Sequence, residues 1–205
     1  MGATTWLDRI TDESNLWLSA SKAEEAKEYP RAAIHYLEDA GECFERGSKG
    51  RAALSCYCAA ECLAAMGATE EAKSLYVQSG KLYTVIADHG VSGSIREALW
   101  ALQRAYACYV MAEQVKEAEA TNDAFKLLAR RANPFSGGSN WLEMPKVSPK
   151  QRGGQTAPLP AEVKTSTDEF LALCGSRVRI ERAEPRTRRT GGMVDDQEGL
   201  VSQLG

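Results

Sequence analysis

The six cysteines are the first candidates for chemistry in this chain of 205 residues. Cys58 and Cys62 are one helical turn apart, a spacing at which two thiolates can share a metal ion. A structural zinc site needs four ligands, and the only histidines are His35 and His89. Five of the cysteines fall in segments predicted to be helical, which is typical of buried, reduced thiols. Core packing is therefore favoured over a metal site, and we expect neither a metal nor another cofactor.

The glycine-rich segment Gly90 to Ser94 is the other feature that suggests enzyme chemistry. It reads Gly-Val-Ser-Gly-Ser and lacks the lysine with which a phosphate-binding loop reaches the phosphates, so we interpret it as a connection between helices. Neither histidine has an evident catalytic partner, and both are expected at the surface. No nucleophile and base, metal cluster or phosphate loop is assembled. We therefore expect that the protein is not an enzyme and has no small-molecule substrate.

One segment near the C-terminus is strongly basic, although the whole chain has a net charge of −3. Six arginines against Glu181 and Glu184 give this segment a net charge of +4. Each arginine near an anionic membrane contributes about 1 kcal/mol, so a weak contact with such a membrane or with RNA is one hypothesis. A solvated tail is the other, and the absence of interleaved aromatic residues argues against sequence-specific RNA recognition. The arginines are Arg177, Arg179, Arg182, Arg186, Arg188 and Arg189.

Most of these residues are positioned by helices that carry a repeated stripe. Ala33 to Phe44 and Ala72 to Tyr83 have small or apolar residues at i, i+3, i+4, i+7, i+8 and i+11, with only Ser79 departing from that character. The second copy follows the first by 39 residues, and a degraded third copy at Ala118 follows by a further 46. Gly41 and Gly80 are equivalent mid-helix positions, where glycine costs about 1 kcal/mol relative to alanine. We therefore expect both glycines to lie at close helix crossings.

The repeat predicts an all-α fold, in which residues 1–135 form a solenoid of about three antiparallel helical hairpins. Residues 136–205 are predicted to be a Pro/Gly/Ser-rich extended tail. Within the tail we expect docking by Trp141 and Leu142, a short helix near 166–174, strand-like alternation at 177–180, and the Arg-rich segment 177–189. The helices of the solenoid are predicted at about 11–29, 30–47, 51–66, 69–87, from 94, and at 115–131.

Two segments resemble a known family of helical-repeat proteins. Arg31 to Gly47, and Met66 to Ala72 running into Leu75-Tyr76 and Gly80, resemble the soluble N-ethylmaleimide-sensitive-factor attachment proteins, whose hairpins are similar to tetratricopeptide repeats but longer. The resemblance covers about residues 11–133. It implies a twisted sheet of hairpins that holds coiled-coil membrane-fusion complexes. The family recruits a hexameric disassembly ATPase through a C-terminal part that has no clear counterpart here.

The resemblance and the absence of reaction chemistry predict a non-enzymatic adaptor that handles vesicle-trafficking or membrane-fusion complexes and binds proteins such as coiled coils. The alternative is a structural subunit of a larger, for example ribonucleoprotein, assembly in which the tail wraps its neighbours. No apolar run approaches the roughly 20 residues of a membrane span. The N-terminus also lacks the basic and apolar regions of a signal peptide. We expect a cytoplasmic protein, at most peripheral to membranes.

The expected protein-binding surface lies on the third and fifth predicted helices, away from their small-residue stripes. Exposed aromatic residues beside charges are typical of protein interfaces. Packing of Tyr57 and Trp100 between successive hairpins is the alternative interpretation. The candidate residues are Leu54, Tyr57, Glu61, Trp100, Gln103 and Arg104.

Overall fold

The computed structural model of the protein describes residues 15–90, 94–132, 144–148 and 158–183. All regular structure in these residues is α-helical, as predicted, and they contain no strand. The helices are α2 (Leu16–Glu25), α3 (Tyr29–Glu45), α4 (Lys49–Ala65), α5 (Thr69–Gly90), α6 (Ile95–Met111), α7 (Val115–Ala132) and α8 (Ala161–Ala183).

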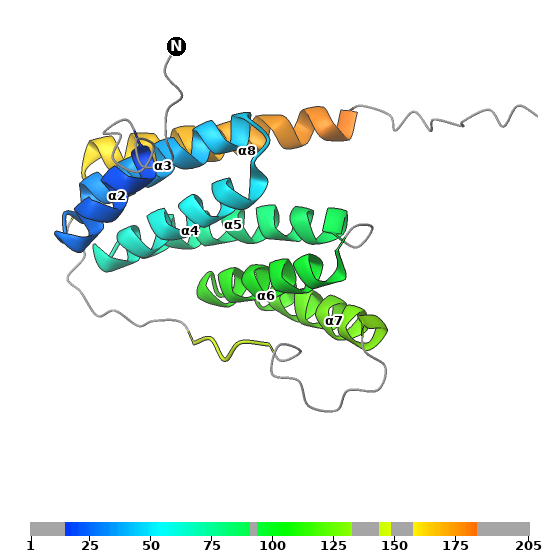
Figure 1. The fold of residues 1–205 in the computed structure, drawn as a ribbon. Coiled ribbons are helices and arrows are strands. Elements are labelled where there is room, and N and C mark those ends of the chain that lie inside the picture. The colour runs from blue at the N-terminus through cyan, green and yellow to red at the C-terminus, as the bar shows by residue number, and fades with distance from the viewer. Residues whose placement is uncertain (1–14, 91–93, 133–143, 149–157, 184–205) are drawn as a thin grey trace, which may run out of the picture.

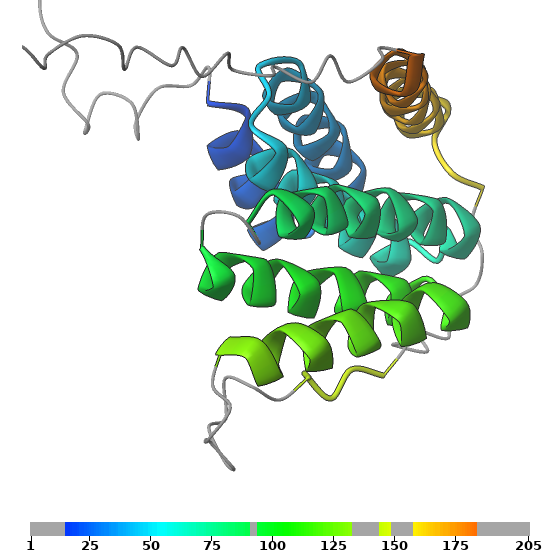
Figure 2. The same cartoon turned by 90° about the vertical axis from the view of Figure 1, so that its right-hand side faces the viewer.

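Packing between the helices follows the order of the chain. Each helix from α2 to α7 packs against the next one, and α8 packs back against α3 and α5. Figure 1 shows α2 with α3, α4 with α5, and α6 with α7 as three pairs, one above another. In Figure 2, α8 lies at the outside of this stack, beyond α3. The stack therefore has one face built by α2, α4 and α6, and α8 covers part of the α3 and α5 side.

The same turn ends α2, α3, α4 and α6. Each of these helices is followed by a residue with positive φ: Lys27 (61°), Gly47 (78°), Gly67 (83°) and Glu113 (58°). After α2, the amide of Glu28 donates to the carbonyl of Ala23 at 2.8 Å, and the equivalent bonds recur at the other three turns. This pattern satisfies the last carbonyls of a helix and reverses the chain. The turns at Lys27 and Gly67 are 40 residues apart, so the hairpin repeats at that spacing.

Lys27 is in a conformation that favours glycine, which leads to a stability prediction. Replacing Lys27 with glycine is expected to stabilise the protein by about 0.5–1 kcal/mol, because a left-handed backbone costs a residue with a Cβ about 1–2 kcal/mol and the greater freedom of unfolded glycine offsets part of that gain. Gly67→Ala should destabilise by about 1 kcal/mol for the same reason. Urea denaturation measures both changes.

Ala26 supplies the control, since it adjoins Lys27 but has an ordinary φ of −76°. Ala26→Gly should lower the urea midpoint, because glycine there gains no strain relief and loses helix propensity. If Lys27→Gly lowers the midpoint as Ala26→Gly does, the left-handed turn is not stabilising the protein as described.

Small residues let the helices around α4 approach closely. α4 is covered by both α3 and α5, and its buried residues are Ala52, Ala53, Ser55, Cys56, Ala59, Ala60, Cys62 and Leu63. Buried polar atoms in this region are satisfied: Ser79 Oγ donates to the carbonyl of Ala53 at 2.8 Å, and Cys56 Sγ to that of Leu75 at 3.2 Å. Close packing of this kind makes the stack intolerant of added volume.

The two mid-helix glycines differ in their surroundings. The expectation of a close crossing is confirmed for Gly80, where an added Cβ would lie 2.9 Å from Cε1 of Tyr109 on α6. It is wrong for Gly41, where the nearest atom to an added Cβ is Cδ2 of Leu173, at 3.8 Å. Gly41 faces α8, so its neighbour comes from the C-terminal helix and is in ordinary van der Waals contact.

Two predicted boundaries are wrong. α5 runs through Gly90, beyond the expected end at residue 87, because Gly90 can lie tightly against Ala98 of α6. The short helix expected near 166–174 is a helix of 23 residues, and the predicted strand-like segment 177–180 belongs to it. Its inward stripe, with Val163 and Thr167 one turn apart, outweighs an alternation of only four residues. Trp141 and Leu142 lie outside the described residues.

Candidate protein-binding face

Three pairs of aromatic rings join the two layers of helices. In each pair a ring from α2, α4 or α6 packs on a buried tyrosine of α3 or α5, with centroid distances of 5.1 to 5.6 Å. The buried tyrosines form a floor, and the outer rings stay partly accessible from the α2–α4–α6 face, the surface carrying Trp17, Tyr57 and Trp100. The pairs are Trp17 with Tyr36, Tyr57 with Tyr76, and Trp100 with Tyr83.

Two arginines lie over the tryptophans of this face. The guanidinium of Arg51 is 4.3 Å from the Trp17 ring centroid, and that of Arg104 is 5.8 Å from the Trp100 ring centroid. Arg51 Nε also donates to the Asp39 carboxylate at 3.0 Å, and the buried Ser55 hydroxyl donates to the same carboxylate. Arg51 therefore fastens α2, α3 and α4 together. Arg104 is exposed and has its cation available to a partner.

Two carboxylates are held at the other end of the face by tyrosine hydroxyls. Tyr36 donates to Glu24 at 2.8 Å, and Tyr76 donates to Glu61 at 2.6 Å. Burial is the main cause that raises the pKa of each tyrosine, and the adjacent carboxylate raises it further. These bonds position Glu24 and Glu61 beside a groove of about 450 Å³ between α2 and α4.

Cys58 lies near the same carboxylates and has no nucleophilic character. Burial raises its pKa to about 12, and the charges of Glu24 and Glu61 add to the shift. The thiol is therefore protonated at neutral pH, whereas reactive cysteines have a lowered pKa. Among the described residues, no group of three or more His, Cys, Asp or Glu side chains could hold a metal ion.

A second groove connects α4 with α6. It has a volume of about 480 Å³ and lies between the start of α4 and the start of α6, with Ile86 of α5 at its base. Gly50 and Trp100 line opposite sides of it, and Leu54 follows Gly50 by one helical turn. Leu54 and Trp100, which are 39% and 44% exposed, therefore belong to one surface.

The structure places all six predicted binding residues on α4 and α6. Arg104 is exposed, and Tyr57, Glu61 and Gln103 are half-buried. Trp100 and Tyr57 partly fit both interpretations, because each packs on a tyrosine of α5 and each keeps accessible surface. In the basic segment, Arg177, Arg179 and Arg182 fall within α8, and Arg186, Arg188 and Arg189 lie outside the described residues.

Sequence reasoning missed the α2 part of the face, which contains Trp17 and Glu24. A signal for it was present, since Trp17 precedes Tyr57 by 40 residues and Tyr36 precedes Tyr76 by the same spacing. The aromatic pairs and the turns share this repeat, which is one residue longer than the 39 of the stripe alignment. Aligning the aromatic residues would have added Trp17 to the face.

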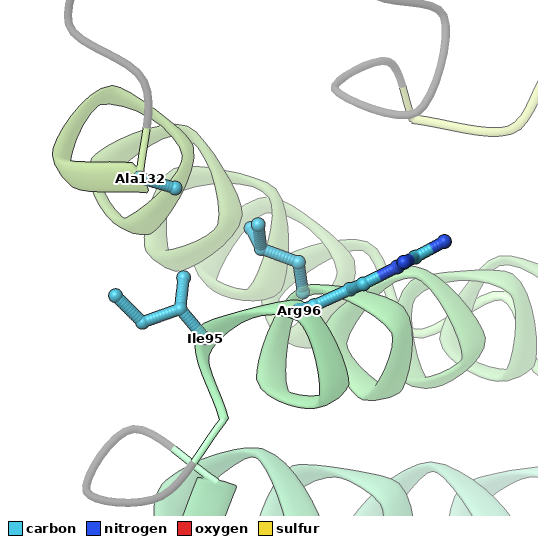
Figure 3. Close-up of a pocket in the computed structure, with 4 residues that line it drawn as sticks. Ile95, Arg96 and Ala132 are labelled. Carbon is cyan, nitrogen blue, oxygen red and sulfur yellow. The ribbon is translucent and has the colours of Figure 1, made fainter.

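A third, more apolar pocket lies at the other edge of α6. It has a volume of about 490 Å³ and is lined by Ile95, Arg96, Leu99 and Ala132, where the start of α6 meets the end of α7 (Figure 3). Arg96 is the one titratable group in this lining, so the pocket offers no pair of groups for acid–base chemistry.

Comparison of the chain with protein-family models, curated proteins and solved structures finds no match. In the part of the chain that the structure describes, no helix combines the length and the apolarity needed to cross a bilayer. The argument for function therefore depends on the α2–α4–α6 face, which presents fixed aromatic rings, exposed apolar side chains and positioned charges.

Proposed function

We propose that this protein is a non-enzymatic adaptor that stacks its helical hairpins as a solenoid and binds another protein on the α2–α4–α6 face. The observation that carries the proposal is the exposure of two large apolar side chains, Leu54 and Trp100, beside the exposed Arg104. Binding energy at protein interfaces concentrates in residues such as tryptophan, tyrosine and arginine. A solvent-exposed tryptophan at a groove is costly unless a partner covers it.

The rigidity of this face supports the proposal. Trp100 is fixed by the Tyr83 ring, which it meets at an interplanar angle of 85°. Because the ring is held before a partner arrives, binding loses less side-chain entropy than it would with a mobile anchor. The resemblance to the attachment-protein family suggests a helical, coiled-coil partner in vesicle trafficking or membrane fusion, bound along the outer helices.

The test is a partner-capture experiment with a double variant. Leu54→Ala with Trp100→Ala is expected to lower capture of the partner at least about tenfold, since interface anchors of this type typically contribute 2 kcal/mol or more each. Quantitative mass spectrometry of proteins bound to the tagged full chain measures the loss. Helicity should persist, because both side chains are at the surface.

Leu127→Ala is the matched control. Leu127 is 64% exposed on α7, away from the α2–α4–α6 face, and its removal should leave capture unchanged. Equal capture by the wild type and the folded double variant would refute the proposed surface. Loss of capture in the Leu127 variant would place the binding site on α7 instead.

A further inference from the structure

α8 is attached to the stack through one narrow stripe. Its buried side chains are Val163, Thr167, Phe170 and Cys174, at i, i+4, i+7 and i+11. They lie on the groove between α3 and α5, here called the α3–α5 groove, where α8 meets Gly41, Cys56, Gln78 and Lys81. α4 buries eight of its seventeen residues against neighbours on both sides. α8 is therefore held less extensively than the helices of the stack.

The contact between α8 and α3 is also loosely packed. A Cβ added to Gly41 would still be 3.8 Å from Leu173, whereas one added to Gly80 would be 2.9 Å from Tyr109. Residues 133–160 separate α7 from α8, and 28 residues can extend to roughly 90 Å. α8 can therefore leave the groove without pulling on α7 or disturbing the other helices.

Two of the four inward residues of α8 are not the best fillers of an apolar groove. The Thr167 hydroxyl is buried and donates to the carbonyl of Val163 in its own helix at 2.8 Å. The Cys174 thiol interacts with the side chain of Gln78. A helix with valine or leucine at these two positions would bury more apolar surface in the same groove. Such a helix would compete with α8 once it is supplied by another molecule.

We propose that the α3–α5 groove is a second protein-binding surface, that α8 occupies it in the resting chain, and that a partner protein's amphipathic helix displaces α8. The partner helix would carry small or medium apolar side chains at i, i+4, i+7 and i+11 and polar residues elsewhere. The pattern is that of α8, the helix already seated there. This surface is on the other side of the stack from the α2–α4–α6 face, so the proposal does not depend on the adaptor function.

Cys174 provides the readout in the full chain. It is completely buried under α8, and burial raises its pKa to about 11. Release of α8 would expose the thiol and return its pKa toward the ordinary value, which restores its reactivity with maleimide. Cys56 and Cys108 are buried within the stack and serve as internal references for global unfolding.

Maleimide labelling of the full chain, followed residue by residue by mass spectrometry, tests both parts of the proposal. Cys174 should react at least about 100-fold faster than Cys56 and Cys108, because α8 opens separately from the stack. A synthetic peptide of residues 158–183 that carries Thr167→Val and Cys174→Val should raise Cys174 labelling about tenfold. The same peptide with Val163→Asp and Phe170→Asp should have no effect.

Labelling of Cys174 in step with Cys56 and Cys108 would overturn the proposal, since α8 would then leave only when the stack unfolds. A peptide that leaves Cys174 labelling unchanged would also overturn it, because the groove would be closed to other helices. An increase with protein concentration alone would make the occupant α8 of a second copy and would refute the partner assignment. Gly41→Leu should increase labelling by pressing on Leu173, whereas Gly41→Ala should not.

Discussion

Replacing Gly80 with leucine is expected to destabilise the protein by about 3 kcal/mol or more. Even a single Cβ at this position would lie 2.9 Å from Cε1 and 3.0 Å from Cζ of the Tyr109 ring. Tyr109 is buried, and its hydroxyl lies 3.4 Å from that of Thr84, so the ring has little room to move. Overpacking of a dense core typically costs 1–3 kcal/mol, and leucine adds three carbons beyond the Cβ that already clashes. Urea denaturation followed by circular dichroism measures the loss.

Gly41→Ala is the matched control for Gly80→Leu. The new Cβ at Gly41 would be in ordinary contact with Leu173, and alanine improves helix propensity by up to about 1 kcal/mol. Gly41→Ala should therefore leave the urea midpoint unchanged or raise it, and Gly80→Ala should lower it. If Gly80→Leu has no effect on the midpoint, α5 and α6 do not cross as closely as the structure shows.

The helices of the stack were predictable because their signals are local. Pro30 in the first turn of α3 and Gly67 after α4 mark boundaries by backbone chemistry alone, and the apolar stripes give the buried faces. Local signals also include the Ser94 side chain, which accepts from the amide of Glu97 at 3.3 Å and begins α6. These elements needed no knowledge of the tertiary structure.

The contacts across the sequence were less predictable. Gly41 and Gly80 are equivalent in the repeat, yet one meets α8 and the other meets Tyr109, because α8 returns from residue 161 to cover α3. The link between Asp39, Ser55 and Arg51 likewise joins residues on two helices whose charges look solvated in the sequence. The candidate face was half visible, since α4 and α6 carry its apolar residues and α2 adds Trp17 only through packing on Tyr36.

The protein is also expected to unfold cooperatively between about pH 10 and pH 11. Its core holds an unusual number of weak acids in their neutral form, and burial is the first cause that raises the pKa of each. The buried groups are Tyr36, Tyr76, Tyr83, Tyr109, Cys56, Cys108 and Cys174. In the unfolded chain the same groups titrate near their ordinary values, about 8.5 for a thiol and about 10 for a phenol.

The sign of the effect follows from proton binding. Below about pH 8.5 both states keep these protons and the groups do not change stability with pH. Above it the unfolded chain loses protons that the folded chain retains, so stability falls as pH rises until the folded pKa is reached, which is about 11 for Cys174 and about 12 for Cys108. Each such group removes about 1.4 kcal/mol per pH unit. Several groups together remove roughly 10 kcal/mol by pH 11, which is comparable with the whole stability of a typical domain.

Phenolate absorbance and helicity, recorded together during an alkaline titration, test this expectation. Both signals should change in one transition, because the buried tyrosines can ionise only when the stack opens. Tyr83→Phe should move the transition to higher pH, since it removes one buried acid, whereas Tyr29→Phe, at a half-buried residue, should move it less. If the core tyrosines ionise while helicity persists, water reaches the floor of the α2–α4–α6 face in the folded state. The aromatic pairs would then be too loosely packed to hold Trp100 in place for a partner.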